Sequence, residues 1–531
     1  MSYWAESEIA RDQIVLFPTT LSDRIPEDHS VRLFWELLET YDWRAWEAQY
    51  CGGHGQPAIH PRIVAGVLLY GLTQGIRSSR RLEWACGHAV DFIWLAEGRV
   101  IDHSTLCGFR TRFRRELKDL FRHLGRLAMA MGVVRLNCVA LDGTRVAANS
   151  SRHGTRKAES IEEELAKLDQ RLEAMLTEAE AVDQRESAGL FGEDATPVTS
   201  VPKELASLRG RQEKLKKALA MLQARQAAGS KQQSVALSDP EAPILPNKTG
   251  GFAPNFTPVT AVDAANHFIV AEQVEGDLGE AQALLPLLAQ TEETYGETPQ
   301  TALADSGFCT PDNLEGLVDH PTDAYLAPMG ERLEGEHQTP SSKPNAAHRA
   351  DPRVPVPADR HGELPRNEHG HLTKEAFLYD QTADGYWCPM GQPLTYVRTE
   401  QETREGTVLE RRIYQGRACA GCPLRVSCTD KKRYRRIRSN GRNPLREAMT
   451  EKVHSAEGRR LYRQRQAVAE SPFGILKRVM GVRQFLLRGL EKVRAEWRWA
   501  CTAYNLRILM AWVRRQRAKW TVGELAGGVM A

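Results

Sequence analysis

The sequence predicts a mixed α/β protein, in which a sheet flanked by helices follows an all-helical N-terminal region and is interrupted by a helical hairpin and a small four-cysteine lobe. Three observations predict this class. Short apolar runs typical of buried strands occur at 137–143, 256–274 and 301–307. Helical spacing of apolar residues dominates the first 130 residues, and it returns in two charged stretches further along the chain. The length of 531 residues allows roughly two to four structural units.

The N-terminal region, residues 1–130, is predicted to be a helical domain that ends in a basic amphipathic helix. Apolar residues recur at helical spacing between 28 and 95. Ser104 and Thr105 then offer a cap ahead of the basic helix. A short helix, a tight turn and a basic helix could bring arginines to a groove or to phosphates, or the helix could present a solvated basic face. The arginines concerned are Arg110, Arg112 and Arg114.

The rest of the chain alternates between strand-rich and helical stretches. Two charged helices separated by a glycine-containing stretch predict an inserted antiparallel hairpin. A segment rich in Pro, His, Arg and Glu predicts a loop or linker. The predicted order is a first strand segment at 131–155, the hairpin at 156–238, middle strands at 239–330, the linker at 331–376, the cysteine lobe at 377–437, basic helices at 438–518 and a tail at 519–531.

The net charge of +3 conceals a strong asymmetry. Residues 431–519 contain 25 Lys and Arg against 6 Asp and Glu, a local net charge of +19, so the remaining residues carry 3 − 19 = −16. A basic segment of this size is typical of a protein that contacts a polyanion, most simply nucleic acid. Solvated helix faces are the alternative.

The start of the chain lacks the basic region and apolar run of a signal peptide, and no stretch reaches the roughly 18 apolar residues of a membrane helix. We therefore expect a cytoplasmic protein. Six scattered cysteines are expected to be small buried residues in a reducing compartment. They are Cys51, Cys86, Cys107, Cys138, Cys309 and Cys501.

Two acidic residues each close a short apolar strand, Asp142 in VALDG and Asp305 in ALADSG. Acids at strand ends can converge at one edge of an open sheet although they are distant in sequence. Mg²⁺ prefers a few carboxylates and keeps water and phosphate oxygens as its other ligands. Two such ions about 3.5–4 Å apart can activate an attacking oxygen and stabilise a leaving one. The pattern favours a metal site for phosphodiester chemistry, with turn or helix-cap roles as the alternative.

A third acid, Glu470, stands in the basic C-terminal region. Arg463, Glu470 and Lys477 are seven residues apart, which predicts that one helix carries them on one face. Pro472 conflicts with such a helix, because proline in a helix interior costs about 3 kcal/mol or kinks it. The helix could instead begin near Ser471–Pro472 and leave Glu470 at its positive end.

These motifs resemble those of bacterial insertion-sequence transposases with a DDE catalytic domain, and the resemblance covers nearly the whole chain. LDGTRVAANSS resembles the motif around the first Asp of that family, and LADSGFCTPDNL the motif around the second. GQPAIHPRIVAGVLLYGLTQGIRSSRRLEWAC and IDHSTLCGFRTRF are similar to its helical N-terminal domain. EGRRLYRQRQAVAESPFGILKRVMG resembles its signature of Tyr, Arg, Glu and Lys, which falls here on Tyr462, Arg465, Glu470 and Lys477. Four residues, instead of the usual three, separate Arg465 from Glu470, so Arg463 is an alternative partner.

The resemblance implies an RNase H-like core, with the hairpin and the cysteine segment as insertions. It implies a reaction that uses Mg²⁺ or Mn²⁺ and forms no covalent link between protein and DNA. Asp142, Asp305 and Glu470 would be the catalytic residues and metal ligands. Arg463, Arg465 and Lys477 would bind phosphate or orient the DNA end, and Tyr462 could stack on a displaced base.

Four cysteines cluster in the segment 377–437. Cys-x2-Cys is the ordinary spacing of two thiolates on one tetrahedral Zn²⁺, and the flanking Gly and Pro suit tight turns. The pattern predicts a structural zinc that orders a small lobe. An Fe–S cluster and unmetallated or redox-active thiols are the alternatives. The four residues are Cys388, Cys419, Cys422 and Cys428.

These features together predict a DNA transposase. It would bind the terminal inverted repeats of an insertion sequence through its N-terminal helices and catalyse Mg-dependent cleavage and strand transfer into target DNA. Synapsis of two ends implies at least a homodimer, in a bacterial cytoplasm close to the nucleoid and without a membrane partner. A catalytically silent repressor derived from a transposase, and an RNase H-like nuclease without strand transfer, are the other classes that the sequence leaves open.

Overall fold

The computed structural model divides the chain into two compact units. Unit 1 comprises Met1–Arg225, Gln232–Leu326 and Gln464–Ala531, and unit 2 comprises Gln226–Lys231 and Ala327–Arg463. The predicted tail at 519–531 and Cys51 lie outside the described residues. None of the described helices is long and apolar enough to cross a membrane. The structure describes residues 20–50, 57–187, 201–230, 232–246, 250–276, 279–327, 351–367, 369–380, 383–404, 407–429, 434–440 and 444–516.

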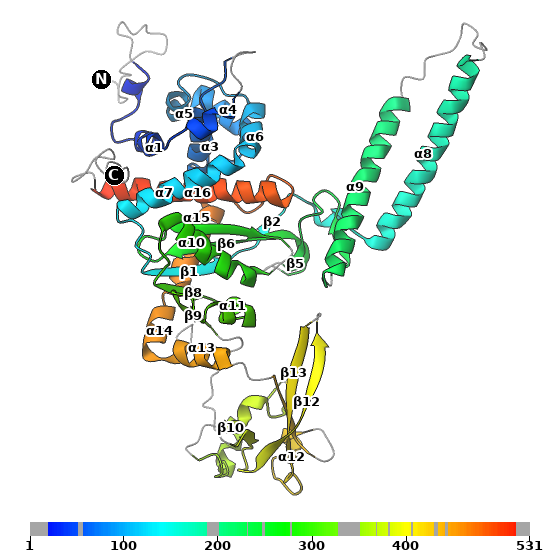
Figure 1. Cartoon of the computed structure of the whole chain (residues 1–531), viewed down its shortest axis with the longest axis vertical. Coiled ribbons are helices and arrows are strands. Elements are labelled where there is room, and N and C mark those ends of the chain that lie inside the picture. The colour runs from blue at the N-terminus through cyan, green and yellow to red at the C-terminus, as the bar shows by residue number, and fades with distance from the viewer. Residues whose placement is uncertain are drawn as a thin grey trace, which may run out of the picture. The chain divides into compact units, whose positions relative to one another are not determined.

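The N-terminal part of unit 1 is helical, as predicted (Figure 1). Side chains of His29, His60, Ser78 and Asp102 accept from backbone N–H groups and so cap four of these helices. The elements are the 3-10 turn η1 (Ser22–Arg24), α1 (Ser30–Glu39), α2 (Arg44–Glu47), α3 (Pro61–Thr73), α4 (Ser79–His88), α5 (Val90–Leu95), α6 (His103–Arg112) and α7 (Arg114–Ala130).

The basic helix predicted after Ser104 and Thr105 differs from the structure in two respects. Its cap is Asp102, whose Oδ2 accepts from the Ser104 N–H at 2.8 Å. It is also two helices, α6 and α7, because the chain turns at Phe113. The ring of Phe113 is buried and stacks on Trp46 with 4.9 Å between centroids. Burial of this aromatic ring in the helical core accounts for the break.

A seven-stranded mixed sheet forms the centre of unit 1. Its main path runs β2-β6-β1-β8-β9, and β5 and β7 also pair with β6. β1 is antiparallel to β6 and parallel to β8, so the C-terminal ends of β1 and β8 meet at one edge. The strands are β1 (Cys138–Gly143), β2 (Val146–Ala147), β5 (Ile244–Pro246), β6 (Phe252–Asp263), β7 (Ile269–Glu275), β8 (Thr301–Ala304) and β9 (Asp323–Leu326).

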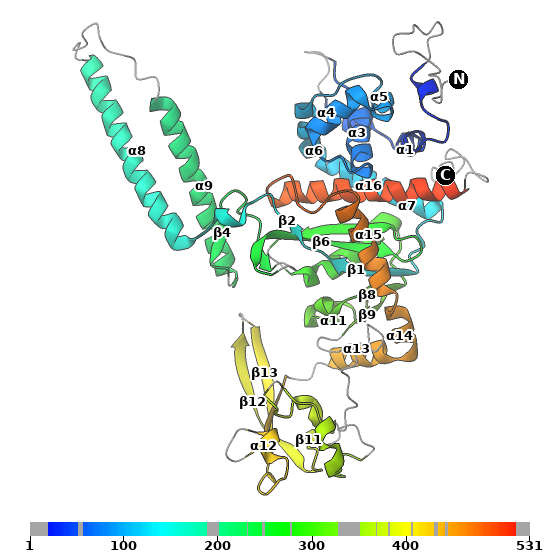
Figure 2. The same ribbon diagram turned by 180° about the vertical axis from the view of Figure 1, so that it is seen from behind.

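Helices cover both faces of this sheet. Figure 1 shows α10 on the viewer's side, and Figure 2, seen from behind, shows α15 crossing β1 and β6 on the other. The long helix α16 packs against β7, α3 and α7, and it buries Trp497, Trp499 and Tyr504. The helices and turns are η3 (Glu280–Ala283), α10 (Leu284–Tyr295), η4 (Ser306–Phe308), α11 (Pro311–Gly316), α15 (Arg465–Arg478) and α16 (Leu490–Gln516).

Two long helices, α8 (Ala158–Ser187) and α9 (Val201–Ala227), make up the predicted helical hairpin (Figure 1). η2 (Arg152–Gly154) leads into β3 (Thr155–Lys157), which pairs with β4 (Ser234–Ala236) beside the hairpin. Apolar residues three and four apart on the two helices face each other, as the sequence pattern requires. The buried seam consists of Ile161, Leu165, Leu168, Leu215, Ala218, Leu222 and Val235.

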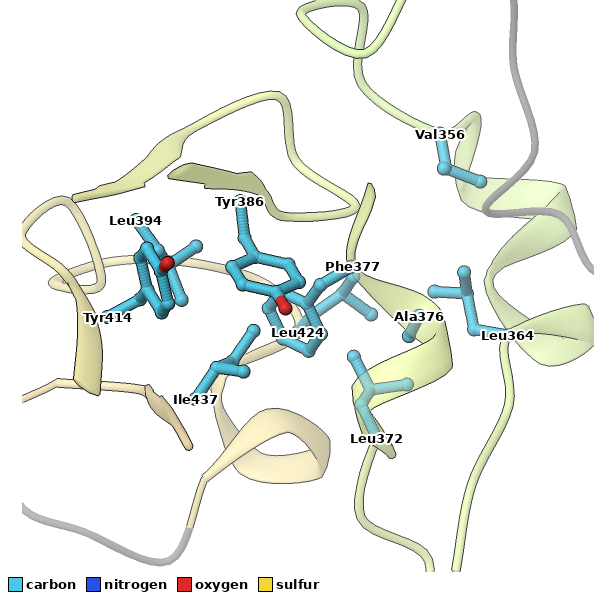
Figure 3. Packing of buried hydrophobic residues seen from close by; sticks show 10 residues of the cluster. All are labelled: Val356, Leu364, Leu372, Ala376, Phe377, Tyr386, Leu394, Tyr414, Leu424 and Ile437. Atoms are coloured by element: carbon cyan, nitrogen blue, oxygen red, sulfur yellow. The ribbon is translucent and has the colours of Figure 1, made fainter. Parts of the chain in front are cut away.

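Unit 2 contains a five-stranded sheet in which each strand pairs antiparallel with the next. Its apolar core includes Val356, Leu364 and Leu372, so the described part of the predicted linker packs against the lobe (Figure 3). The elements are η5 (Ala358–Glu363), η6 (Lys374–Ala376), β10 (Leu378–Asp380), β11 (Gly385–Trp387), β12 (Pro393–Arg404), β13 (Thr407–Gly416), α12 (Arg425–Cys428), β14 (Arg436–Asn440), α13 (Pro444–His454) and α14 (Ala456–Tyr462).

Candidate active site

Asp142 and Asp305 lie at the same edge of the central sheet. Asp142 is the penultimate residue of β1, and Asp305 directly follows β8. The two strands are parallel neighbours, and Leu141 is paired with Ala304. The residue that follows each member of this pair is an aspartate, so Asp142 and Asp305 lie side by side along the chain direction. The Asp305 Oδ1 accepts from the Gly307 N–H at 2.8 Å, which fixes the carboxylate at the start of η4. The sheet therefore brings together the two acids that were predicted to converge.

The environment of Asp142 disfavours its charged form. Burial is the largest cause, and it raises the pKa of Asp142 to about 6. The Arg465 guanidinium opposes this shift, whereas the nearby carboxylates of Asp305 and Glu280 add to it. The Gly143 N–H donates to Asp142 Oδ1 at 2.8 Å and favours the charged form, but it does not reverse the shift. Like charges gathered in a partly desolvated place are typical of functional sites.

Glu280 is a residue of this site that sequence reasoning missed. It is the first residue of η3. A Cβ built on Gly143 would overlap the Glu280 Oε2, and one built on Gly307 would lie 3.2 Å from the Glu280 Oε1. The Glu280 carboxylate thus reaches both loops that carry the aspartates. The sequence signal is weak, because an acid in the first turn of a helix is common for its interaction with the helix dipole.

Helix α15 begins at Arg465 and not at Ser471–Pro472, the alternative that the proline suggests. Pro472 lies inside the helix, on the buried face that packs against β1 and β6, and this packing holds the helix together across the missing N–H. Arg463 is the C-terminal cap of α14, so the chain turns between Arg463 and Arg465. The predicted single helical face is therefore limited to Glu470 and Lys477.

Glu470 lies on the exposed side of α15. Its Oε1 accepts from the Gln466 amide at 3.4 Å, one turn earlier in the helix. The strongest charged neighbours of Asp142 are Arg465, Asp305 and Glu280. The role of Glu470 as third metal ligand thus stays a prediction, on the helix that also carries Arg465.

Lys477 binds the loop that follows Asp142. Its Nζ donates to Thr144 Oγ1 at 2.5 Å and to the Arg145 carbonyl at 2.8 Å. Thr144 is buried, which shields the first of these bonds from water. The C-terminal half of α15 and the loop after β1 are therefore joined by a charge-assisted contact.

Thr260 supplies a buried polar group beside Asp142. It lies on β6 directly opposite Asp142, and paired residues of antiparallel strands project from the same face. The side chain is fully buried, and its Oγ1 has no hydrogen-bond partner among the described residues. Carboxylates and hydroxyls are hard oxygen donors, so this group of residues fits a Mg²⁺ or Mn²⁺ ion.

The arginines predicted to bind DNA in the N-terminal region have different surroundings. Arg110 donates to the Arg77 carbonyl at 2.7 Å, and burial lowers its pKa. Arg112 donates to the Gln49 carbonyl, and its guanidinium lies 4.8 Å from the ring centroid of Tyr50. Arg114 is exposed at the start of α7.

In unit 2, Arg463 is exposed, whereas Tyr462 is only 7% exposed. The stacking of a displaced base on Tyr462 therefore stays a prediction, for a ring that is largely buried. The structure thus leaves Arg463, and not Tyr462, at the surface of this part of the signature.

The four clustered cysteines of unit 2 line one cavity of about 410 Å³. All four are half-buried, and Cys388, Cys422 and Cys428 pack against the same apolar core. Burial raises the pKa of Cys428 to about 11, with Arg435 opposing the shift and the other three thiols adding to it. The thiols are therefore close enough to influence one another. They are Cys388, Cys419, Cys422 and Cys428.

Only one trio of His, Cys, Asp or Glu in the described part of the chain has ligand atoms within 4.8 Å of one another. It consists of Glu83, Asp102 and His103. The His103 Nδ1 lies 3.0 Å from the Glu83 Oε2, and Asp102 caps α6. This surface group has a capping and ion-pairing role. The four thiols and the sheet-edge carboxylates are spaced more widely.

Two regions of the chain match family models. Residues 387–510 match the family described as "Transposase DDE domain", and residues 19–112 match the family described as "Transposase domain (DUF772)". The first match contains the four clustered cysteines and Glu470, and Asp142 and Asp305 precede it. The second contains α1 to α6. No curated protein and no solved structure matches the chain.

Proposed function

We propose that this chain, an insertion-sequence DDE transposase, binds the terminal inverted repeats of its element and catalyses metal-dependent DNA cleavage and strand transfer. A transposase DDE domain belongs to a nucleic-acid-processing enzyme, and such domains use divalent metals. The observation that carries the proposal is the convergence of Asp142 and Asp305 at the C-terminal ends of two adjacent parallel strands. The mixed sheet with helices on both faces is consistent with an RNase H-like core.

Asp142, Asp305 and Glu470 would hold the catalytic ions. Bound Mg²⁺ would activate the attacking oxygen and stabilise the leaving oxygen of an in-line displacement at phosphorus. The raised pKa of Asp142, which is caused mainly by burial, supports this assignment, because a bound cation would stabilise the charged form that burial disfavours.

The chain's own residues would position the DNA and the carboxylates. Lys477 holds the loop after Asp142 through Thr144 and Arg145. Arg465 places a positive charge near Asp142, where it could also meet a phosphate of the DNA end. The Gly307 N–H orients the Asp305 carboxylate. Each of these contacts fixes a group before DNA arrives, which lowers the cost of reaching the reactive geometry.

The other parts of the chain would supply binding surfaces. The N-terminal helices, with Arg112 and Arg114 at or near the surface, would bind the terminal repeats. The hairpin of α8 and α9 would clamp DNA or join two copies of the chain, since synapsis requires a homodimer; a passive insertion is the alternative.

A structural zinc in unit 2 is part of the proposal. The support for it is the cavity that the four thiols share and the Cys419-x2-Cys422 spacing. Zinc would deprotonate the thiols and draw them together, and so tie α12 and the turn after β13 to the core of the lobe. It would have no part in the reaction.

The test is an assay of the full-length chain on labelled terminal-repeat DNA with Mg²⁺. Cutting together with joining supports the transposase; cutting alone indicates a nuclease, and binding alone a repressor. Asp142→Asn should abolish cutting while binding persists. Asp312→Asn, an exposed acid in the first turn of α11, is the matched control and should cut normally. Full cutting by Asp142→Asn would overturn the site.

A further inference from the structure

The loops that carry Asp142 and Asp305 leave room for a third carboxylate. Gly143 follows Asp142, and Gly307 lies two residues after Asp305. A methyl group at Gly143 would collide with one oxygen of Glu280. A methyl group at Gly307 would crowd the Asp305 Oδ1 at 3.0 Å and the other oxygen of Glu280 at 3.2 Å. Neither glycine has a positive φ, so backbone conformation does not demand them. The Glu280 carboxylate therefore fills the space beside Gly143, and it shares the space beside Gly307 with the Asp305 carboxylate.

The Glu280 carboxylate lies close enough to the two aspartates to act on the charge of Asp142. Asp305 and Glu280 both act on Asp142 in the direction that disfavours its negative charge, and Arg465 is the cation that opposes them. Repulsion among carboxylates is relieved when they share a divalent ion.

Thr260 provides an independent sign of a missing ligand. A buried polar group that lacks a hydrogen bond is destabilising, because nothing compensates for the water that it has lost. The Thr260 hydroxyl is such a group among the described residues, and it projects from the same face as Asp142 on the neighbouring strand. An ion at this edge, or a water molecule bound to the ion, would give the hydroxyl a partner.

We propose that Glu280 is a further metal-binding carboxylate of this site, and that it holds a divalent ion together with Asp142 and Asp305. The inference rests on the proposed function, because it concerns the same metal site. Glu280 approaches the sheet edge from η3, which leads into α10 on one face, whereas Glu470 is carried by α15 on the other face. The ion site would thus be built from two strand ends and from a helix on each side of the sheet.

The test measures Mn²⁺ binding to the full-length, metal-free protein by isothermal titration calorimetry. Glu280→Gln keeps the size of the side chain and removes its charge. We expect its affinity for Mn²⁺ to fall at least about tenfold, as expected for the loss of a charged ligand. Glu292→Gln, an exposed position on α10, is the matched control and should bind as the parent does. Equal affinities in Glu280→Gln and the parent would overturn the inference.

A second variant separates ligation from a structural role. Gly143→Ala leaves Glu280 intact but displaces its carboxylate, because the atoms nearest to the added methyl group all belong to Glu280, so it should also weaken Mn²⁺ binding. For each variant the rise in Tm on adding Mn²⁺ is compared with its own Tm in EDTA. We expect a smaller rise for Glu280→Gln and Gly143→Ala, and partial recovery in Glu280→Asp. A change only in the Tm measured in EDTA, with an unchanged rise on adding Mn²⁺, would show a structural role and overturn the inference.

The outcomes for the inference and for the proposed function are distinguishable. If the parent binds Mn²⁺ and cuts DNA, and Asp142→Asn loses both while Glu280→Gln loses neither, only the inference fails. If the parent neither binds Mn²⁺ nor cuts terminal-repeat DNA, the metal site itself is wrong and both fail.

Discussion

Lys477 donates a hydrogen bond to the hydroxyl of Thr144 at 2.5 Å, and this contact joins α15 to the loop that follows Asp142. The two residues are far apart in sequence, and each belongs to a motif that resembles the transposase signature. The contact shows how a lysine seven residues after Glu470 can act on the first aspartate without touching it.

Replacing Lys477 by Met should loosen this loop. Hydrogen bonds to charged groups contribute about 1.5–3 kcal/mol, so the free energy of unfolding in urea should fall by about that amount. DNA cutting should fall as well, because the Asp142 loop loses its tether. Arg478→Gln, at an exposed position next in the helix, should change neither quantity. An unfolding free energy equal to that of the parent would show that the tether is not formed in solution.

The stability of the metal-free protein should depend on pH through Asp142. The pKa of this carboxyl is about 6 in the folded protein and 3.8 for the ordinary carboxyl. Between these values the folded state binds more protons than the unfolded state, so this group's contribution to stability falls as the pH rises through the window. Asp142→Asn removes the effect. The stability of the variant relative to the parent should therefore increase from pH 4 to about pH 6 and then level off, as measured by urea unfolding in EDTA. A constant difference would contradict the raised pKa.

Mn²⁺ binding should weaken in acid for the same reason. A proton on Asp142 competes with the ion, so the apparent affinity should fall about tenfold for each pH unit below about 6. Calorimetric titrations at pH 5 and pH 7.5 measure this difference. An affinity that does not change between these values would mean that Asp142 is not a ligand.

Arg110 and Arg114 should behave differently when neutralised. Arg114 is exposed, so Arg114→Gln should weaken DNA binding. The slope of log affinity against log salt concentration should become shallower by about 1, because one phosphate contact is lost. Arg110 is turned inward to the Arg77 carbonyl, so Arg110→Gln should lower Tm with a smaller effect on the salt dependence. Binding isotherms at several salt concentrations, with Tm measured for each variant, distinguish the two. A reversal of these effects would mean that Arg110 turns outward on DNA.

The cysteine lobe should lose its metal when one of its four clustered cysteines is replaced. Cys422→Ser removes a proposed ligand, and the zinc content of the purified protein should fall from one ion per chain to near zero. Cys107→Ser, at an exposed cysteine on α6, is the control and should retain the metal. Elemental analysis that finds neither zinc nor iron in the parent would remove the metal from this lobe.

Sequence reasoning predicted the features that depend on local pattern and strand direction. Asp142 and Asp305 each follow an apolar run, and adjacent parallel strands then bring such residues to one edge. The turn at Phe113 was not predictable, because it depends on the stacking of this ring on Trp46. Pro472 suggested that a helix starts there, whereas α15 begins at Arg465 and continues through the proline. The packing of α15 on the sheet, which stabilises the helix at this point, cannot be read from the local sequence.

Two further features required three-dimensional information. The predicted lobe proved to contain a five-stranded antiparallel sheet, whose strands β12 and β13 are polar and show little of the apolar alternation that marks a strand. Glu280 was missed because it is distant in sequence from Gly143 and Gly307, and only the folded chain brings its carboxylate close to them.

The chain order of these elements has a consequence for biosynthesis. Asp142 and Asp305 precede the main segment of unit 2, Ala327–Arg463, in the sequence, and α15 with Glu470 follows it. A ribosome therefore completes residues 327–463 before it makes the helix that covers β1 and β6. Until then the nascent protein has two of its three proposed DDE carboxylates and an open sheet face. Premature termination between residues 327 and 463 would yield a fragment that keeps the N-terminal helices, Asp142 and Asp305 but cannot complete the proposed catalytic centre.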